Sequence, residues 1–162
     1  MSRYIISVWL ILLTSVAMAQ PMGKASVDQI VEKLEVPPMK TRGLRNLAPA
    51  PRNIDLVIQF DFDSAKLQEV SKPLLNNLAS AMKNQRLEGL SFTVEGHTDA
   101  KGTEEYNLRL SARRAETVVN YMTQQGVAKD RLTPVGKGAT ELLNVEKPEA
   151  LENRRVRITT VQ

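Results

Sequence analysis

The sequence has no cysteine and a single histidine, and each of these shortages excludes particular kinds of site. Without cysteine there is no disulfide framework, no thiolate zinc site, no cysteine nucleophile and no N-terminal cysteine that could carry a lipid. Because His97 is the one histidine, a histidine-rich metal cage is excluded, and any Ser-His-Asp triad has to use that residue. The composition therefore argues against most enzyme classes. We expect a protein that is not an enzyme and that uses no metal or cofactor.

One long apolar run is present, and it lies at the start of the chain. Ile5 to Val16 forms an apolar segment of twelve residues behind a single charge, Arg3. A membrane-spanning helix needs about 20 apolar residues, so this run is short for that purpose. Residues 17–19 (AMA) give the small-x-small pattern that a signal peptidase cleaves. We therefore expect residues 1–19 to be a cleaved secretory signal peptide; the alternative is an uncleaved anchor.

Residues 20–53 combine a basic excess with most of the prolines. The segment carries six basic and three acidic residues, whereas residues 54–162 carry fifteen of each. Five of the eight prolines lie in it, which is typical of an extended linker. A nucleic-acid-binding domain usually carries its basic patch on the fold itself, so this distribution predicts no nucleic-acid partner. We expect residues 20–53 to be a Pro-rich basic arm.

A short helix is predicted within this arm. Residues 26–29 (SVDQ) match a capping box, and apolar residues follow on one helical face: Val27, Ile30, Val31 and Leu34. A helix of about ten residues is marginal in isolation. The sequence leaves open whether it docks on a partner, docks on the domain, or forms only transiently in a tether.

Residues 54–162 have the hydrophobic periodicity of a folded domain. Alternating apolar residues predict strands over residues 54–62, 90–94, 131–135 and 155–161. Helical spacing predicts one helix from Pro73 to Met82 and a long one over residues 104–125, before Gly126. Residues 136–138 (GKG) predict a turn. The order β-α-β-α-β-β indicates an α+β sandwich, in which two main helices cover a mixed four-stranded sheet.

Four blocks in this domain occur in the register of a known family. They are residues 62–67 (FDSAKL), 96–107 (GHTDAKGTEEYN), 110–115 (LSARRA) and 153–156 (NRRV). Together they resemble the OmpA-like peptidoglycan-associating domain, which is shared by OmpA-type outer-membrane proteins, Pal lipoproteins and flagellar stator proteins. The resemblance covers residues 54–162. The chain departs from Pal because it has no cysteine to carry a lipid.

The resemblance implies binding of the diaminopimelate residue in the peptidoglycan stem peptide. The free end of that residue is a zwitterion, so recognition needs one anion and one cation a few ångströms apart. The resemblance assigns the ammonium to Asp99 and the carboxylate to Arg114, whose planar fork suits bidentate binding. It also places four further residues around the pocket: Thr98, Asn107, Leu110 and Arg154.

Several of these residues also have an ordinary structural interpretation. Asp99 equally suits a cap for the long helix, because carboxylates stabilise helix N-termini. By spacing alone, Arg113 and Arg114 are both typical of solvated helix charges, and only the family register favours Arg114. His97 follows a glycine at a strand end, which favours a hydrogen bond that braces the loop over a catalytic role.

Three functions remain open from the sequence. The favoured one is non-covalent binding of peptidoglycan, tethering the cell envelope, in the periplasm of a Gram-negative bacterium and in association with the outer membrane. The alternative is a structural component of an envelope machine, in which residues 20–53 bind an envelope protein. A cell-wall hydrolase built on Glu95, Asp99 and His97 is least supported, because no nucleophile has an evident base and no metal-ligand spacing appears.

Overall fold

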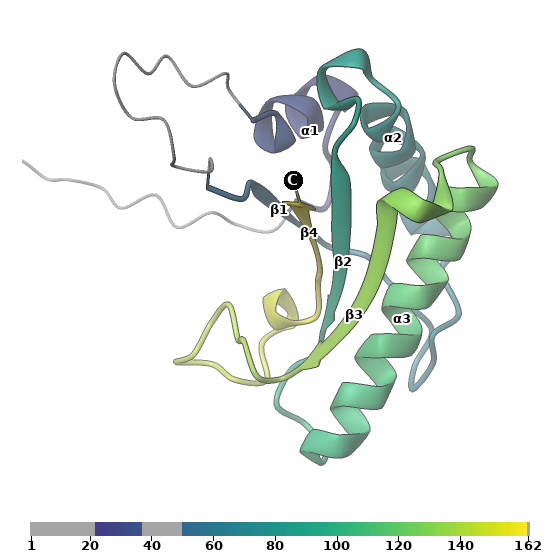
Figure 1. Cartoon of the computed structure of the whole chain (residues 1–162). Helices are drawn as coiled ribbons and strands as arrows, with labels where there is room; N and C mark the ends of the chain where they lie inside the picture. The colour runs from purple at the N-terminus through teal and green to yellow at the C-terminus, as the bar shows by residue number, and fades with distance from the viewer. Residues whose placement is uncertain (1–21, 37–49, 162) are drawn as a thin grey trace, which may run out of the picture.

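The computed structural model describes residues 22–36 and 50–161, which form one sheet with helices packed on one of its faces (Figure 1). The strand order is β1-β4-β2-β3; β4 is antiparallel to both of its neighbours, and β2 is parallel to β3. The predicted α+β fold with a mixed four-stranded sheet is therefore confirmed. The elements are α1 (Val27–Leu34), β1 (Asn53–Leu56), α2 (Lys72–Met82), β2 (Ser91–His97), α3 (Glu104–Gln124), β3 (Leu132–Gly138) and β4 (Val156–Val161).

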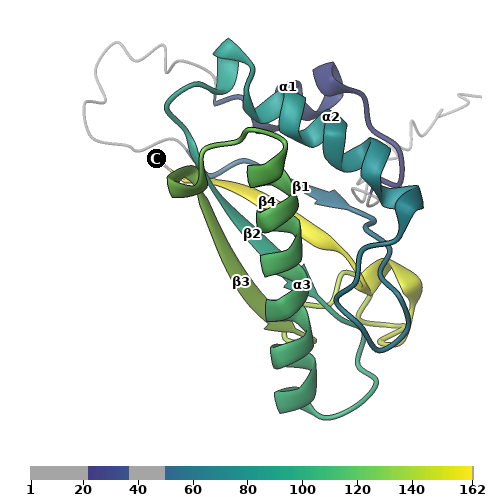
Figure 2. The ribbon, with the colours of Figure 1, turned by 90° about the vertical axis from the view of Figure 1, so that its right-hand side faces the viewer.

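The two-residue period of the strands decides which face of the sheet is buried. On the three strands β1, β2 and β4, alternate apolar side chains join one core with the helices: Ile54, Leu56, Phe92, Val94, Val156 and Ile158. The predicted core face of α3 is confirmed, since Ala115, Val118, Val119 and Met122 are all buried there. The helices cover one face of the sheet (Figure 2), and the intervening residues of these strands are mostly only half-buried.

Helix α1 is part of this core, which corrects the expectation that the arm is an extended linker. Ile30, Val31 and Leu34 are fully buried, in a cluster shared with α2 and β1. The predicted capping box is present, and Asn77 Nδ2 donates a hydrogen bond to the Ala25 carbonyl at 2.8 Å. Burial against the domain stabilises a helix that is too short to persist alone. Residues 20–21 and 37–49 of the arm, and residues 1–19 of the expected signal peptide, lie outside the described residues.

Strand β1 is shorter than predicted. The alternation continues to Phe62, but the strand ends at Leu56 and the chain leaves the sheet. Phe60 forms an antiparallel bridge with Leu67 instead, so the segment between them folds back as a loop. Phe62 lies in that loop and is 99% exposed, rather than in the core.

The predicted turn at residues 136–138 is wrong, because these residues form the end of β3. Glycine is needed there for a different reason, which is the close approach of α3. A β-carbon on Gly136 would lie 2.7 Å from the Leu108 carbonyl oxygen, well inside van der Waals contact. Glycine at positions 136 and 138 therefore lets α3 lie directly on β3.

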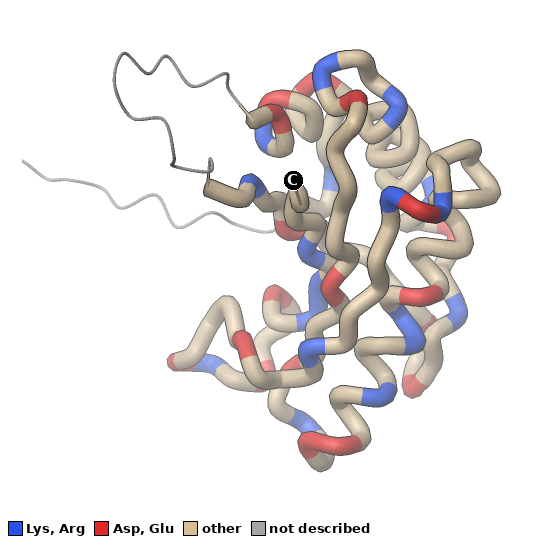
Figure 3. The backbone as a smooth tube through the Cα atoms, in the orientation of Figure 1, with Lys and Arg blue, Asp and Glu red and all other residues tan. Residues whose placement is uncertain are grey.

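Charges of both signs are interspersed along the described chain (Figure 3). This agrees with the equal numbers of acidic and basic residues counted over residues 54–162. Within residues 22–36 and 50–161, no helix is long and apolar enough to span a membrane.

Candidate ligand-binding groove

A groove of about 770 Å³ opens between the loop that follows β1, the loop that follows β2 and the first half of α3. The loop before β4 closes its remaining side through Leu151 and Arg154. The structure thus brings together at one groove all six residues that the sequence analysis placed at the site: Thr98, Asp99, Asn107, Leu110, Arg114 and Arg154.

Asp99 is held in place by its own loop and by α3. Its side chain is 10% exposed, and its Oδ1 accepts a hydrogen bond from the Lys101 amide at 3.1 Å. Asn107 Nδ2 donates to the carbonyl oxygens of Asp99 at 3.3 Å and of Lys101 at 2.8 Å. The cap of α3 is Thr103, so the carboxylate of Asp99 is not used for capping. The loop therefore presents a rigid carboxylate to the groove.

Arg114 enters the groove from α3 with its guanidinium already oriented. Its Nε donates to the Ser64 carbonyl at 2.9 Å, and its guanidinium carbon lies 4.9 Å from the centre of the Phe60 ring. A cation over an aromatic face is attracted by the ring quadrupole. Among the described residues, its two terminal nitrogens have no hydrogen-bond partner, so that edge of the fork is open to an anion.

The electrostatic environment of Arg114 also favours an anionic ligand. Burial, followed by the neighbouring Arg154 guanidinium, lowers the pKa of Arg114 from its ordinary value. Arginine remains protonated in proteins, so Arg114 keeps its charge. The free-energy cost of burying that charge is therefore only partly offset by the neighbouring groups. A bound carboxylate would offset that cost.

Arg154 and Thr98 complete the polar part of the groove. Arg154 Nη1 lies 3.7 Å from Asp99 Oδ2, which is longer than a hydrogen bond. The Thr98 amide donates to the Gly138 carbonyl at 2.9 Å, whereas its buried hydroxyl has no partner among the described residues. A buried polar group without a hydrogen-bond partner is costly, so this hydroxyl is an unsatisfied group in the wall of the groove.

Asn153 has a role that sequence reasoning missed. Its side chain is fully buried and donates from Nδ2 to the carbonyls of Asn144, Lys147 and Pro148 at 3.2, 3.0 and 3.0 Å. Its Oδ1 accepts from the Asn144 amide at 2.8 Å. One side chain thus organises the loop that carries Leu151 and Arg154 to the groove. Its place in the NRRV block was the available signal.

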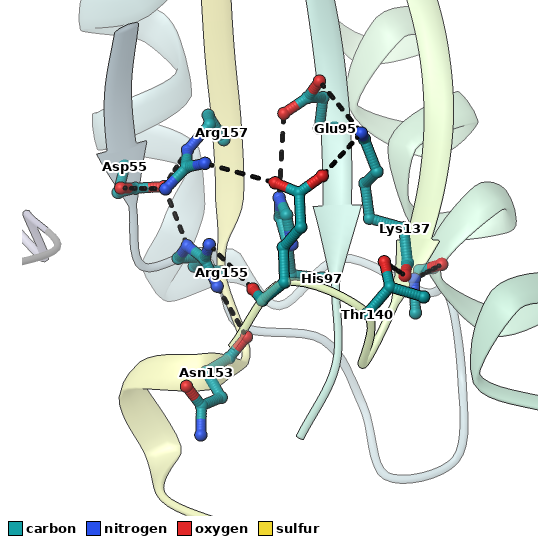
Figure 4. A network of polar contacts seen from close by, with 11 residues as sticks. Asp55, Glu95, His97, Lys137, Thr140, Asn153, Arg155 and Arg157 are labelled. Carbon is teal, nitrogen blue, oxygen red and sulfur yellow. Dashed lines mark hydrogen bonds and ion pairs between the residues drawn. The ribbon is translucent and has the colours of Figure 1, made fainter. Parts of the chain in front are cut away.

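A polar network anchors the start of β4 to β1 (Figure 4). The buried Arg155 donates from Nε to Asp55 Oδ1 at 2.8 Å, and Arg157 contacts both Asp55 oxygens at 3.0 and 3.1 Å. Burial raises the pKa of the Asp55 carboxyl, but the hydrogen bonds and charges of the two arginines outweigh it and lower that pKa below its ordinary value. Asp55 is therefore a charged anchor of the fold.

His97 lies beside this network and does not line the groove. Its side chain is fully buried, and neither ring nitrogen has a hydrogen-bond partner among the described residues. Glu95 Oε2 lies 3.8 Å from Nε2, which is beyond hydrogen-bonding distance. The expected loop-bracing hydrogen bond is therefore wrong. Asp99 lines the groove, whereas Glu95 and His97 do not, so the three residues of the hydrolase alternative do not share one site. Nor does any cluster of potential metal ligands occur in the described ranges.

The buried His97 predicts acid-sensitive stability. Burial, reinforced by the charges of Arg155 and Arg157, lowers the pKa of His97 from 6.5 to about 4. The unfolded chain takes up this proton near pH 6.5 and the folded chain does not until about pH 4, so acid favours unfolding. Over that interval we expect the free energy of unfolding to fall by about 3 kcal/mol through His97.

Urea unfolding of the protein and of His97→Gln, between about pH 7 and about pH 4, measures this effect. The glutamine variant retains a polar side chain but has no proton to gain, so its stability should fall less steeply with acid. Equal pH dependence in the two proteins would contradict the assignment.

The chain is similar in sequence to known proteins. Outer membrane porin F of Pseudomonas aeruginosa is 40% identical over 106 residues, which cover 64% of this chain and 30% of that protein. Peptidoglycan-binding protein ArfA of Mycobacterium bovis is 35% identical over 103 residues, covering 62% of this chain and 31% of that protein. The chain thus spans under a third of the length of these two relatives.

A solved structure shows the same fold. The crystal structure of the peptidoglycan-associated lipoprotein from Burkholderia pseudomallei matches with a TM-score of 0.55 and 29% identity, over 64% of this chain and 88% of that one. The family model described as "OmpA family" matches residues 59–157, which include all six residues predicted for the site. The chain therefore belongs to the OmpA family.

Proposed function

We propose that this domain binds cell-wall peptidoglycan non-covalently through the diaminopimelate zwitterion of the stem peptide. The observation that carries the proposal is the pairing, in one groove, of the rigid Asp99 carboxylate with the open guanidinium edge of Arg114. Asp99 binds the ammonium and Arg114 binds the carboxylate. Two relatives whose names refer to peptidoglycan support the choice of polymer.

Preorganisation lowers the cost of this binding. Asn107 fixes the Asp99 loop, while Phe60 and Ser64 fix Arg114, so little side-chain freedom is lost when the ligand enters. Arg154 makes only a loose ion pair with Asp99, at 3.7 Å and without a hydrogen bond, so the ammonium has no hydrogen bond between them to displace. Charged hydrogen bonds contribute about 1.5–3 kcal/mol each, which gives a modest affinity at one site. Repetition along the polymer raises retention through avidity.

The same binding places the domain in the periplasm, where it tethers the envelope to the wall. The alternative, a machine component whose arm binds an envelope protein, has less support. The apolar face of α1 is buried in its own domain, so that face is not free for a partner. This leaves direct wall binding as the function that the site supports best.

Co-sedimentation with purified sacculi tests the proposal. The protein should sediment with the sacculi, and free diaminopimelate should release it. The matched control is 1,5-diaminopentane, which has the same carbon chain between two ammonium groups and no carboxylate. Failure to sediment, or equal release by 1,5-diaminopentane, would contradict a zwitterion site. Release of soluble wall fragments would instead identify a hydrolase.

A further inference from the structure

His97 occupies the junction between the sheet and the loop that carries Asp99. It is the last residue of β2, and its side chain is fully buried. Its amide donates to the Arg155 carbonyl, just before β4, at 2.9 Å, and the Thr98 amide donates to the Gly138 carbonyl, at the end of β3, at 2.9 Å. Asp99 follows directly, so the position of its carboxylate depends on how the sheet holds residues 97–98.

The His97 ring is held by packing and not by hydrogen bonds, since neither of its nitrogens has a partner among the described residues. The register of β2 against β3 also shifts between Gly96 and His97, an irregularity that is common beside functional sites, where it re-aims a side chain. A neutral imidazole is tolerated in such a place, whereas a buried imidazolium needs an acceptor.

Charged side chains from all four strands and the loop after β3 lie around this ring (Figure 4). They are the cations Lys137, Arg155 and Arg157 and the carboxylates Asp55, Glu95 and Glu141. Asp55 already accepts hydrogen bonds from both arginines, and Glu141 accepts one from Lys137 at 2.7 Å. Glu95 Oε2 lies beside the ring but 3.8 Å from Nε2. A proton on the ring would therefore have cations nearby and no carboxylate within hydrogen-bonding distance.

We infer that His97 positions the Asp99 loop only while its ring is neutral, so that acid releases the loop from the sheet and weakens ligand binding. The effect on the ligand rests on the proposed function, whereas the release of the loop does not. When residues 97–98 leave the sheet, the protonated ring reaches water at the cost of few backbone hydrogen bonds. The loop keeps its contact with Asn107 on α3, but the Asp99 carboxylate is no longer fixed opposite Arg114.

Two protonation equilibria set the size of this effect. Burial, followed by the charges of Arg155 and Arg157, lowers the pKa of His97 from 6.5 to about 4 in the closed structure, whereas a released ring regains the ordinary pKa. Burial also raises the pKa of the Glu95 carboxyl, so acid removes a negative charge beside the ring. Between about pH 7 and about pH 5 the released form therefore gains about twentyfold over the closed form through His97.

Amide hydrogen exchange of the purified protein at these two pH values, corrected for intrinsic rates, tests the release. The protection of the His97 and Thr98 amides should fall about twentyfold with acid, and dilute urea should leave their exchange unchanged, because a local opening exposes little surface. Val94, paired within the same strand, is the control and should show stronger protection that urea weakens. Equal protection and equal urea dependence at all three amides would overturn the inference, since loop and core would open together.

Two substitutions remove the titrating proton and keep the site filled. His97→Gln retains a polar side chain, and His97→Phe retains a ring that needs no hydrogen-bond partner, so the second should fold even where glutamine is poorly accommodated. The protection of the amides at positions 97 and 98 should then show no acid-dependent fall. A twentyfold fall that persists in either folded variant would overturn the assignment to His97.

Calorimetric titration with free diaminopimelate at the same two pH values tests the coupling to the site. The unaltered protein should lose affinity with acid severalfold more than His97→Phe, which retains every other titratable group, and at most about twentyfold more. Equal loss in the two proteins would overturn the positioning role. Absence of binding at about pH 7 would instead overturn the proposed function, and the exchange experiment would still decide whether the loop is released.

Discussion

Asp99→Asn and Arg114→Ala are each expected to abolish binding to sacculi while the domain stays folded. Asp99→Asn keeps the shape of the side chain and its hydrogen bond to the Lys101 amide, but it removes the charge that faces the ammonium. Arg114→Ala removes the guanidinium fork, and alanine is a strong helix former. Loss of one charged hydrogen-bonding group costs about 1.5–3 kcal/mol, which is roughly a tenfold to hundredfold loss at one site. Avidity multiplies that loss on the polymer.

Two further variants separate recognition from structure. Arg114→Lys keeps the charge but lacks the planar fork, so it should bind weakly if bidentate geometry matters. Arg113→Ala is the control, because Arg113 is exposed and lies about 100° around the helix from Arg114. Co-sedimentation and thermal melting of the four variants would be measured together. Retained binding by Asp99→Asn and Arg114→Ala, or equal loss in Arg113→Ala, would refute the zwitterion mechanism. Lost binding with a collapsed melting temperature would assign the residues to structure.

Periodicity predicts most of this fold because burial follows it closely. The strand residues of β4 alternate as expected, and the four core residues of α3 lie on one face. The end of β1 was missed because Ile58 is still buried after the ladder has ended at Leu56, so the apolar alternation outlasts the strand. The backbone hydrogen bonds that define the strand cannot be predicted from the alternation of apolar residues.

Helix α1 shows a second limit of sequence reasoning. The sequence predicted its capping box and its apolar face. An amphipathic helix of eight residues, however, has the same pattern whether it docks on its own domain or on a partner. Its position depends on surfaces of α2 and β1 that are distant in the sequence. Proline and charge content favoured a linker because composition carries no information on such long-range contacts.

The candidate site was predictable to the extent that its residues lie in contiguous blocks. Asp99 and Arg114 were found in this way, but their supports were not. Phe60, whose ring faces the Arg114 guanidinium, and Asn153, whose side chain holds the loop before β4, act through contacts that only the folded chain creates. Physical chemistry explains both roles once the distances are known, and spacing alone indicates neither.

Replacement of Gly96 by alanine is expected to be among the most destabilising single changes in the domain. Gly96 lies in β2 on the face covered by α3, and an added β-carbon would lie 2.2 Å from the Ser111 carbonyl oxygen. The clash is with helix backbone, so no side-chain rotation relieves it and α3 has to move away from the sheet. Overpacking of this kind typically costs 1–3 kcal/mol and occasionally more, and we expect about 3 kcal/mol or more here.

The same displacement should impair ligand binding in molecules that remain folded. Gly96 precedes the loop that carries Asp99, while Ser111 lies between Asn107 and Arg114 on α3, so moving the helix separates the two charges of the site. Ser111 Oγ also accepts a hydrogen bond from the Gly138 amide at 2.8 Å, which ties the helix to the end of β3. Urea unfolding and sacculus binding below the unfolding transition would measure both effects.

Gly23→Ala is the control for this change, because no atom beyond Gly23 and its two chain neighbours lies within 4 Å of the position that its β-carbon would take. Its free energy of unfolding should stay within about 0.5 kcal/mol of that of the unaltered protein. Equal stability of Gly96→Ala and Gly23→Ala would show that α3 does not lie as close to β2 as described. Destabilisation without any loss of binding would show that the spacing of Asp99 and Arg114 does not depend on that contact.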